Sequence, residues 1–511
     1  KLKEQHVDAV QQLKGLDGRI QTLKYVAAVL GWDQQVLMPE RAIAGRAEQI
    51  ALMATLIHEK ETANEIGRLL DDIGASDDQP FGSADLSEPD RAYVRASYRD
   101  YRQATRIPSD LVQRIARVTA VARSVWAEAR KKSDFSLFES NLSEIVDLSI
   151  EVAERLGYED HPYDALIDQY EPGMTTADIA RIFRELREGL VPLVRKIKDA
   201  RQVEHKFMLK EFPAKEQEEF GRKVLDAMKF DSGRGRLDIS VHPFTTSLGW
   251  DDVRITTRYH ENRFTSSLFG IIHEAGHGLY ELGFSSEYRG TRLHDAASLG
   301  IHESMSRFWE NVVGRSRPFW HHFYPVVKEH FPQQLSGVDV EKFYRAVNMV
   351  EPSHIRVEAD EVTYSLHVIL RFELERMLIG KELTVKELPD AWREQARDLL
   401  GTEPQHDADG VLQDIHWSGG AIGYFPTYAL GNVYGLQFVS KLRTDLPDFD
   451  DQLRAGKLDG IKGWLDENIH KKGRTRTPKE LCEEISGKPL SAQYFIDYLN
   501  EKYAGIYSLG T

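Results

Sequence analysis

The chain has 511 residues, enough for a large hydrophobic core and, at the usual ~100–200 residues per domain, for three or four domains. Its 66 Lys and Arg residues against 81 Asp and Glu residues give a net charge of -15, which argues against a surface that binds nucleic acid. A single cysteine, Cys482, excludes an internal disulfide framework and a cysteine-based zinc finger. Any zinc site must therefore use histidine and carboxylate ligands.

No apolar run approaches the ~18–20 residues of a membrane span, and the first six residues are polar rather than a signal core. We therefore expect a protein with no membrane partner, located in the reducing cytoplasm. The chain starts with Lys1 rather than Met, so we also expect that a segment has been removed from its start.

From residue 7 to about residue 200, apolar residues recur at three- and four-residue steps, which predicts helices throughout this part. Within it, Thr175 and Asp178 have the spacing of a capping box that opens a helix. After residue 283 the helical pattern returns, interrupted by a loop-rich stretch at 410–435. The sequence therefore predicts a mainly α-helical protein.

The one strong β signal lies between residues 237 and 259. Two runs of alternating residues, 238–241 and 253–257, flank a turn at 249–252, so we expect a small antiparallel hairpin. It directly precedes the segment at 264–283, and an exposed edge strand in this position can pair with an extended peptide.

Residues 273–277 read H-E-x-x-H within a segment of helical periodicity. Side chains four residues apart lie one turn above each other in a helix, so the imidazoles of His273 and His277 can bind one metal ion. Glu274 lies about 100° around the helix, where it can hold a water molecule without being a ligand. The alternative interpretation of the two histidines is a hydrogen-bonded pair in the core.

We expect the helix with this motif to start after an N-cap at Thr265 or Ser266 and to end near Gly283. Gly270, Gly276 and Gly278 each cost about 1 kcal/mol relative to Ala in a helix interior. Their presence predicts that another backbone or a substrate approaches this helix closely.

A catalytic zinc site needs a third protein ligand and an open position for water. Glu303, which lies 26 residues past His277 near the start of a second helical pattern, is the best candidate. On its own, Glu303 would be interpreted as a solvated helix residue paired with Arg307 at i+4. Together with the H-E-x-x-H segment, it predicts a site of two histidines and one glutamate.

A di-iron helical oxidase is a remote alternative, because Glu274 and His277 also match the E-x-x-H spacing of such proteins. The spacing recurs at 351–354, 403–406 and 467–470. Pro352 and Pro404 fall within two of these segments, and proline there is tolerated only at a helix start. A non-catalytic helical scaffold is a further alternative, against which the intact metal-binding pattern argues.

Six ordered motifs point to one family. They are H-P-F at 242–244, D-x-R-x-T at 252–256, H-E-x-x-H at 273–277, H-E-S at 302–304, I-R-x-x-A-D at 355–360 and G-x-x-Q-D-x-H-W at 410–417. With them, the chain resembles the carboxypeptidase Taq family of thermostable metallocarboxypeptidases over nearly its whole length. One position departs from the family: Met305 stands in place of Gln, so the hydrogen bond of that Gln is absent or replaced.

The resemblance implies a mainly α-helical, single-lobed metallopeptidase with a deep substrate groove. It implies one domain over residues 1–511, in which about 1–230 form one wall of the groove and about 231–511 form the catalytic part. It also implies one Zn²⁺ per chain, with Co²⁺ as a substitute, a homodimer, and release of single residues from peptides with a free C-terminus and varied side chains. The nearest alternative is a related zinc endopeptidase or dipeptidyl carboxypeptidase.

The metal in such a site activates water and polarises the scissile carbonyl, and Glu274 takes a proton from the water and passes it to the leaving amine. His416 and Tyr424 are the candidate donors to the oxyanion. Arg356, with Arg254 as the second choice, is the candidate for the terminal carboxylate, because a guanidinium binds a carboxylate bidentately.

The alternative for these arginines is a buried ion pair, of Arg356 with Asp360 and of Arg254 with Asp252. His242, in the first motif, is a further substrate-binding candidate that the resemblance implies. Three aspartates are candidates for orienting the metal-binding histidines: Asp295, Asp360 and Asp414.

Overall fold

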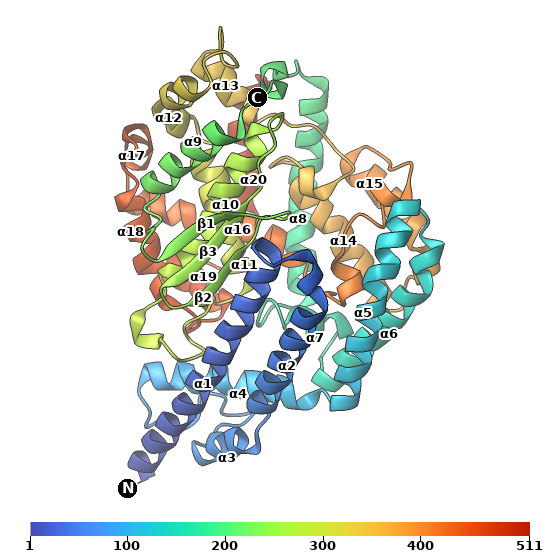
Figure 1. Cartoon of the computed structure of the whole chain (residues 1–511), viewed down its shortest axis with the longest axis vertical. Helices are drawn as coiled ribbons and strands as arrows, with labels where there is room; N and C mark the ends of the chain where they lie inside the picture. The colour runs from blue at the N-terminus through green and yellow to red at the C-terminus, as the bar shows by residue number, and fades with distance from the viewer. Residues whose placement is uncertain (1, 511) are drawn as a thin grey trace.

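The computed structural model describes residues 2–510, and most of them are helical (Figure 1). Before the sheet lie α1 (Leu2–Val36), α2 (Ile43–Glu61), α3 (Asn64–Asp72), α4 (Glu88–Arg106), α5 (Ser109–Lys132), α6 (Ser136–Leu156), α7 (Pro162–Ile167), α8 (Thr176–Asp199) and α9 (Ala214–Ala227). The predicted capping box opens α8, where Thr175 and Asp178 exchange hydrogen bonds. None of the described helices is both long and apolar enough to span a membrane.

The second half of the chain is also helical, as predicted, but the loop-rich stretch expected at 410–435 ends at residue 425, because a helix begins at Pro426. After the sheet lie α10 (Phe264–Leu282), α11 (Leu299–Arg307), the π-helix η4 (Phe308–Gly314), α12 (Arg317–His330), α13 (Val340–Val347), α14 (Tyr364–Ile379), α15 (Leu388–Leu400), α16 (Pro426–Asp445), α17 (Phe449–Ala455), α18 (Asp459–Asn468), α19 (Pro478–Ser486) and α20 (Gln493–Tyr507).

The sheet has three strands in the order β1-β3-β2. β3 (Asp252–Thr257) pairs in parallel with β1 (Gly235–Ile239) and in antiparallel with β2 (Thr245–Gly249). The predicted hairpin between 238–241 and 253–257 is therefore wrong, because the turn that precedes β3 joins it to β2. Only one residue of β2 is buried, so this strand has no alternating apolar pattern by which its sequence could be recognised.

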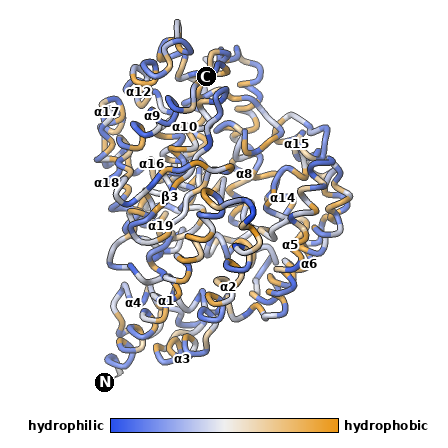
Figure 2. The backbone as a smooth tube through the Cα atoms, in the orientation of Figure 1, coloured by the Kyte–Doolittle hydropathy of each residue, from blue (hydrophilic) through white to orange (hydrophobic). Residues whose placement is uncertain are grey.

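One hydrophobic core runs through the chain from Leu111 to Tyr507. A smaller cluster joins α1, α3 and α4 to Leu293. In Figure 2, orange and blue alternate along outer helices such as α5 and α6, as expected for helices with one face on the core. The division of the chain near residue 230 stays a prediction.

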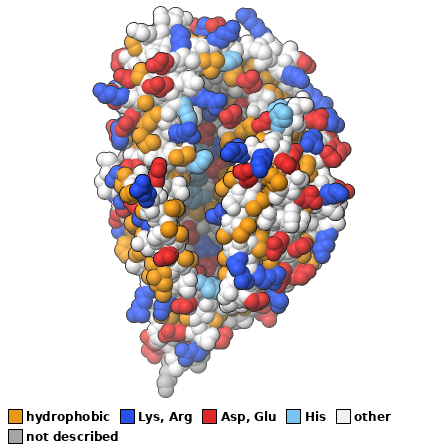
Figure 3. Space-filling view, turned by 45° about the vertical axis from the view of Figure 1, so that its right-hand side comes forward, with side chains coloured by type: hydrophobic (Ala, Val, Ile, Leu, Met, Phe, Trp, Pro, Cys, Tyr) orange, Lys and Arg blue, Asp and Glu red, His pale blue; other side chains and the backbone are white. Residues whose placement is uncertain are grey.

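A long groove runs down one face of the molecule, and histidine side chains lie along it (Figure 3). In Figure 1, α9, α10 and α12 stand on one side of the molecule, and α5, α6, α14 and α15 stand on the other. The deep groove that the family resemblance implies is therefore present.

The helix with the H-E-x-x-H motif, α10, begins slightly earlier than predicted. Its N-cap residue is Arg263, which makes no capping hydrogen bond through its side chain. Thr265 and Ser266 therefore lie in the first turn instead of capping it. The helix ends at Leu282, and Gly283 follows in a right-handed conformation.

Of the three glycines of α10, Gly276 meets another backbone closely, as predicted. Gly278 instead meets side chains, and a Cβ atom on Gly270 would make only an ordinary contact, 3.5 Å from Oγ1 of Thr257. A Cβ atom on Gly276 would lie 2.7 Å from Cα of Ser306 and 2.8 Å from the carbonyl oxygen of Met305, both in α11. A Cβ atom on Gly278 would lie 2.9 Å from the ring of Phe230. The α10 backbone therefore rests directly on the α11 backbone at Gly276, without side chains between them.

We expect Gly276→Ala to lower the midpoint of thermal unfolding, because the methyl group would meet backbone atoms and overpacking costs about 1–3 kcal/mol. The matched control is Gly15→Ala in α1, where a Cβ atom would meet nothing within 4 Å. Gly15→Ala should raise the free energy of unfolding by about 0.5–1 kcal/mol, because alanine is more stable than glycine in a helix interior. A Gly276→Ala variant that unfolds at or above the midpoint of the wild type would contradict the close contact.

The start of α11 is held by a buried carboxylate. The side chain of Ser298 and the backbone N–H of Gly300 each donate to Glu171, at 3.0 Å. Burial raises the pKa of Glu171 from its ordinary value of 4.5 to about 7, although these two hydrogen bonds favour the charged form. Burial thus outweighs the donors, and the folded state holds this proton more tightly than the unfolded chain does.

Because the pKa of Glu171 is higher in the folded state, its contribution to stability is present below about pH 4.5 and is lost as the pH rises to about 7. We expect the wild type to lose stability relative to Glu171→Gln between pH 4.5 and pH 7, as measured by urea unfolding. Glu387→Gln is the control, since the exposed Glu387 has a lowered pKa. A constant difference between the wild type and Glu171→Gln across this range would refute the expectation.

Candidate metal centre

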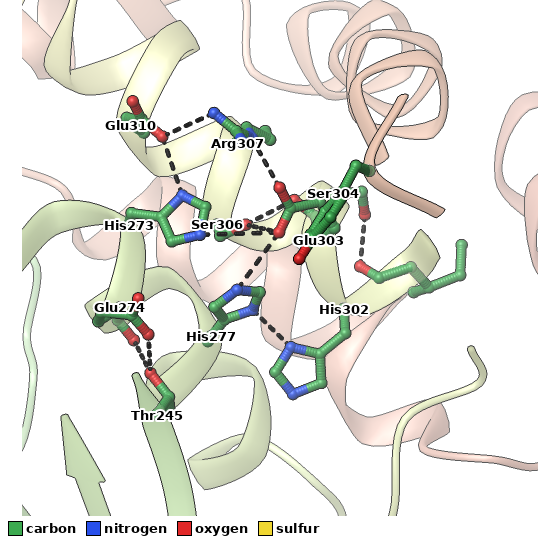
Figure 4. Close-up of polar contacts among 12 residues, drawn as sticks. Thr245, His273, Glu274, His277, His302, Glu303, Ser304, Ser306, Arg307 and Glu310 are labelled. Atoms are coloured by element: carbon green, nitrogen blue, oxygen red, sulfur yellow. Dashed lines mark hydrogen bonds and ion pairs between the residues drawn. The ribbon is translucent and has the colours of Figure 1, made fainter. Parts of the chain in front are cut away.

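The packing of α10 on α11 brings together the three predicted metal ligands (Figure 4). Oε2 of Glu303 lies 3.6 Å from Nε2 of His273 and 3.4 Å from Nε2 of His277. Among the described residues, these three form the one group of His, Cys, Asp or Glu side chains whose ligand atoms all lie within 4.8 Å of each other. Two imidazole nitrogens and one carboxylate oxygen therefore converge on one point.

Each histidine is oriented by a hydrogen bond at its other nitrogen. Nδ1 of His273 donates to Oε2 of Glu310 at 2.9 Å. Nδ1 of His277 lies 2.5 Å from Nδ1 of His302, whose Nε2 lies 3.0 Å from Glu281. If the carboxylate of Glu281 accepts from Nε2 of His302, then Nδ1 of His302 accepts from His277, which leaves the lone pair of Nε2 of His277 facing the site.

The aspartates that we expected in this orienting role lie elsewhere. Asp295 accepts from the backbone of Ala296, and Asp360 accepts from the backbone of the loop before α14. Asp414 is paired with Arg356 and Arg371. Their assignment to the metal-binding histidines is therefore wrong. The helix spacing could have indicated Glu281, which is four residues past His277 on the same face of α10.

The charges of the site are set by burial and by neighbouring groups. Burial, and next the adjacent His302, lower the pKa of His277 to about 3, so its ring is neutral at pH 7. Burial alone would raise the pKa of Glu303, but the guanidinium of Arg307 and then His273 outweigh it and hold that pKa well below its ordinary value. His277 therefore presents a neutral imidazole and Glu303 an ionised carboxylate, which are the forms that bind a metal ion. Burial would also lower the pKa of His273, but the carboxylate of Glu303 and the hydrogen bond to Glu310 outweigh it and raise that pKa.

Glu274 lies beside the two histidines and is held from the sheet. The hydroxyl of Thr245, in β2, donates to Oε2 of Glu274 at 2.6 Å and also lies 2.9 Å from its carbonyl oxygen. Burial raises the pKa of Glu274, and the charge of His273 opposes this shift. Thr245 has no signal in the sequence, because β2 lacks an alternating apolar pattern.

The two arginines predicted to bind substrate are both paired with aspartates. Arg356 donates through Nε and Nη2 to Asp414 at 3.1 and 2.8 Å, so its predicted pairing with Asp360 is wrong. Arg254 binds Asp252 through Nε and Nη2 at 2.8 and 3.0 Å, as its alternative interpretation expected. The Arg356 side chain is 5% exposed and that of Arg254 is 21% exposed, so Arg254 is the more accessible guanidinium.

His416, the first residue of the 3-10 helix η8 (His416–Gly419), lies beside Tyr424, which precedes α16. Their ring centroids are 5.5 Å apart, and Nε2 of His416 lies 3.2 Å from the hydroxyl of Tyr428. Burial lowers the pKa of His416 to about 4, so its ring is neutral. Burial is also the main cause of the raised pKa of Tyr424, and the charge of Glu303 adds to it. Tyr424 therefore lies within electrostatic reach of the metal centre.

Two remaining positions differ in their exposure. The side chain of His242 is exposed, in the segment between β1 and β2. Met305, which replaces the family Gln, is 1% exposed and belongs to the main hydrophobic core. Apolar packing therefore occupies the position of the polar family side chain.

Segments 351–354 and 403–406, which raised the di-iron alternative, are irregular rather than helical. Neither segment can present its Glu and His residues as a pair on one helix face. At 467–470, the imidazole of His470 is bound to Asp466 at 2.7 Å. None of the three spacings provides a second metal centre of the kind formed by α10 and α11.

Comparison with known proteins identifies the family of this chain. The model of the carboxypeptidase Taq (M32) metallopeptidase family matches residues 12–503. Carboxypeptidase 1 of Bacillus subtilis is 39% identical over 492 residues, which cover 96% of this chain and 97% of the relative. Thermostable carboxypeptidase 1 of Thermus thermophilus is 41% identical over 509 residues, which cover 98% of this chain and 99% of the relative.

The fold agrees with these sequence matches. The crystal structure of the M32 carboxypeptidase from Deinococcus radiodurans R1 matches with a TM-score of 0.94 and 39% identity, over 98% of this chain and 100% of that chain. The family that the six motifs predict is therefore confirmed. The chain belongs to the carboxypeptidase Taq (M32) metallopeptidase family, and it is a metal-dependent carboxypeptidase that acts on peptides.

Proposed function

We propose that this enzyme removes single amino acids from the free C-terminus of peptides of varied sequence, with one zinc ion held by His273, His277 and Glu303. Cobalt would serve as a substitute. The observation that carries the proposal is the convergence of both Nε2 atoms on one oxygen of Glu303, with the carboxylate of Glu274 alongside.

The donor set and its spacing support zinc. Two imidazoles and one carboxylate are a common ligand set for catalytic zinc, and they leave a fourth position open. Ligand atoms at about 2.0–2.2 Å from a tetrahedral zinc lie roughly 3.3 Å from one another. The distances from Glu303 to the two histidine nitrogens are 3.4 and 3.6 Å. The side chains therefore need little movement to bind the ion.

A divalent ion in this position supplies a Lewis acid that polarises the scissile carbonyl and lowers the pKa of water. Glu274 then takes a proton from the attacking water and passes it to the leaving amine. Its buried position supports this role, because burial raises the pKa of the carboxyl and makes it a better proton acceptor. His416 and Tyr424 are the proposed donors to the oxyanion, and neither side chain carries a charge near pH 7.

For the terminal carboxylate of the substrate, we now favour Arg254 over Arg356. All three nitrogen atoms of the Arg356 guanidinium have partners, in Asp414 and the hydroxyl of Tyr364. Arg254 retains more exposed surface, and its guanidinium lies 4.3 Å above the ring of Trp32, which holds it in place. His242, which is exposed, stays a further candidate for contact with the peptide.

A homodimer in the cytoplasm completes the proposal. The family resemblance is the reason to expect the dimer. The single cysteine, Cys482, is a buried free thiol, which suits a reducing compartment.

We expect Glu274→Gln to retain the metal and to lower turnover by roughly 100- to 10,000-fold, because the amide cannot accept the proton of the attacking water. Elemental analysis of the purified variant measures the metal, and steady-state hydrolysis of a peptide measures turnover. The control is Glu219→Gln, since Glu219 is exposed on α9. Turnover that survives in Glu274→Gln would remove Glu274 from the role of proton acceptor.

The reaction type is tested with a peptide that has a blocked N-terminus and a free C-terminus. We expect mass spectrometry to detect single amino acids, released in order from the C-terminal end. Dipeptides or internal fragments would instead support the dipeptidyl carboxypeptidase or the endopeptidase.

The same peptide with a C-terminal amide is the control for carboxylate recognition. We expect Arg254→Ala to raise KM for the free acid and to abolish the preference for the acid over the amide. If Arg254→Ala and the wild type prefer the acid over the amide equally, Arg356 becomes the better candidate for binding the terminal carboxylate.

A further inference from the structure

Three charged side chains follow one face of the helix that continues from α11 into η4. Glu303, Arg307 and Glu310 are spaced at i, i+4 and i+7, so they project from the same side of a helix. The π-helix η4 begins at Phe308, directly after Arg307, and carries Glu310. Single π-turns occur frequently at functional sites.

Arg307 binds both carboxylates at once (Figure 4). Its Nε donates to Oε1 of Glu303 at 2.7 Å, and its Nη1 donates to Oε2 of Glu310 at 3.2 Å. Oε2 of Glu310 is also the atom that accepts from Nδ1 of His273, at 2.9 Å. A single guanidinium therefore connects the carboxylate of one proposed metal ligand to the orienting partner of another.

The two oxygens of Glu303 have different environments because of this arrangement. Oε1 is occupied by Arg307, whereas Oε2 faces the two histidine nitrogens and accepts from Ser306 at 3.0 Å. The stem of Glu303 is fixed as well, since a Cβ atom on Gly431 in α16 would lie 2.6 Å from Cγ of Glu303. The carboxylate can neither shift sideways nor turn its other oxygen inward without breaking the bond to Arg307.

Arg307 is itself fixed in position. Its guanidinium carbon lies 4.1 Å from the centre of the Tyr364 ring in α14, and its side chain is 14% exposed. Glu310 has a second cation, Arg315, which donates to its Oε1 at 3.3 Å. Each buried carboxylate of the group therefore has a positively charged partner.

We propose that Arg307 is a positioning residue that holds Glu303 in a one-oxygen orientation toward the metal and, through Glu310, holds the ring of His273 toward the same point. This inference rests on the proposed ligand set of His273, His277 and Glu303. Lysine cannot replace Arg307, because an ammonium is a single point charge without the planar fork that reaches two carboxylates and stacks on a ring.

The test measures Co²⁺ affinity by competition with a chelator, together with the visible absorption spectrum of the Co²⁺-loaded protein. For Arg307→Lys we expect a loss of affinity of roughly 10- to 100-fold, the usual effect of removing a partner of a metal ligand. We also expect altered visible bands, because the orientation of Glu303 changes. Glu310→Gln, which keeps the shape of the side chain, should lose affinity to a similar degree.

The matched control is Arg474→Lys. Arg474 is also a partly buried arginine that binds a carboxylate through two nitrogens, at Asp100, at 2.7 and 2.6 Å, away from the metal centre. This variant should keep the affinity and spectrum of the wild type even if it unfolds at a lower temperature. A loss of the same size in Arg474→Lys would show that general loosening of the fold explains the effect, and would overturn the proposal.

Wild-type affinity and an unchanged spectrum in either Arg307→Lys or Glu310→Gln would also overturn it. If Arg307→Lys does not fold, Glu310→Gln decides the outcome. Glu303→Ala separates this proposal from the one on which it rests. Wild-type Co²⁺ affinity in Glu303→Ala would show that the ligand set itself is wrong, and the role of Arg307 would fall with it.

Discussion

The direct contact between the backbones of α10 and α11 is the constraint on which the site depends. Gly276 lies against Ser306 and the carbonyl of Met305, at distances that leave no room for a side chain. This contact sets the separation of the two helices, and the separation sets the distance from Glu303 to the histidines of α10. Glycine costs about 1 kcal/mol of stability in a helix interior. A larger residue at position 276 would separate the two helices, and a wider helix pair could not form this site.

Charge compensation is the second feature of this interior. Glu303 and Glu310 share Arg307, Glu310 also binds Arg315, and Asp414 lies between two other arginines. A buried charge without a partner costs several kcal/mol, so each of these groups depends on its neighbours. Such networks hold side chains in one orientation before the metal or the substrate arrives, and preorganisation of this kind is what a metal site requires.

The sheet contributes to the same centre from the other side of α10. Thr245 in β2 holds Glu274, and Arg254 in β3 lies against Trp32 of α1. The strands, α1 and α10 are therefore linked by side chains that come from distant parts of the sequence. The proposed proton acceptor and the proposed carboxylate-binding group both depend on this small sheet, although it includes few residues of the chain.

The sequence by itself determined the local features and the family. Helical periodicity, the capping box at Thr175 and the H-E-x-x-H helix depend on residues a few positions apart, and the ordered motifs identified the metallocarboxypeptidase family and Glu303 as the candidate third ligand. Tertiary structure decided the rest: the parallel pairing of β1 with β3, the existence of β2, the partner of Arg356, and Glu310 and His302 in place of the expected aspartates. The physical reason is that pairing between distant segments depends on how helices and strands pack, and a side chain that bonds across such a contact has no local pattern in the sequence.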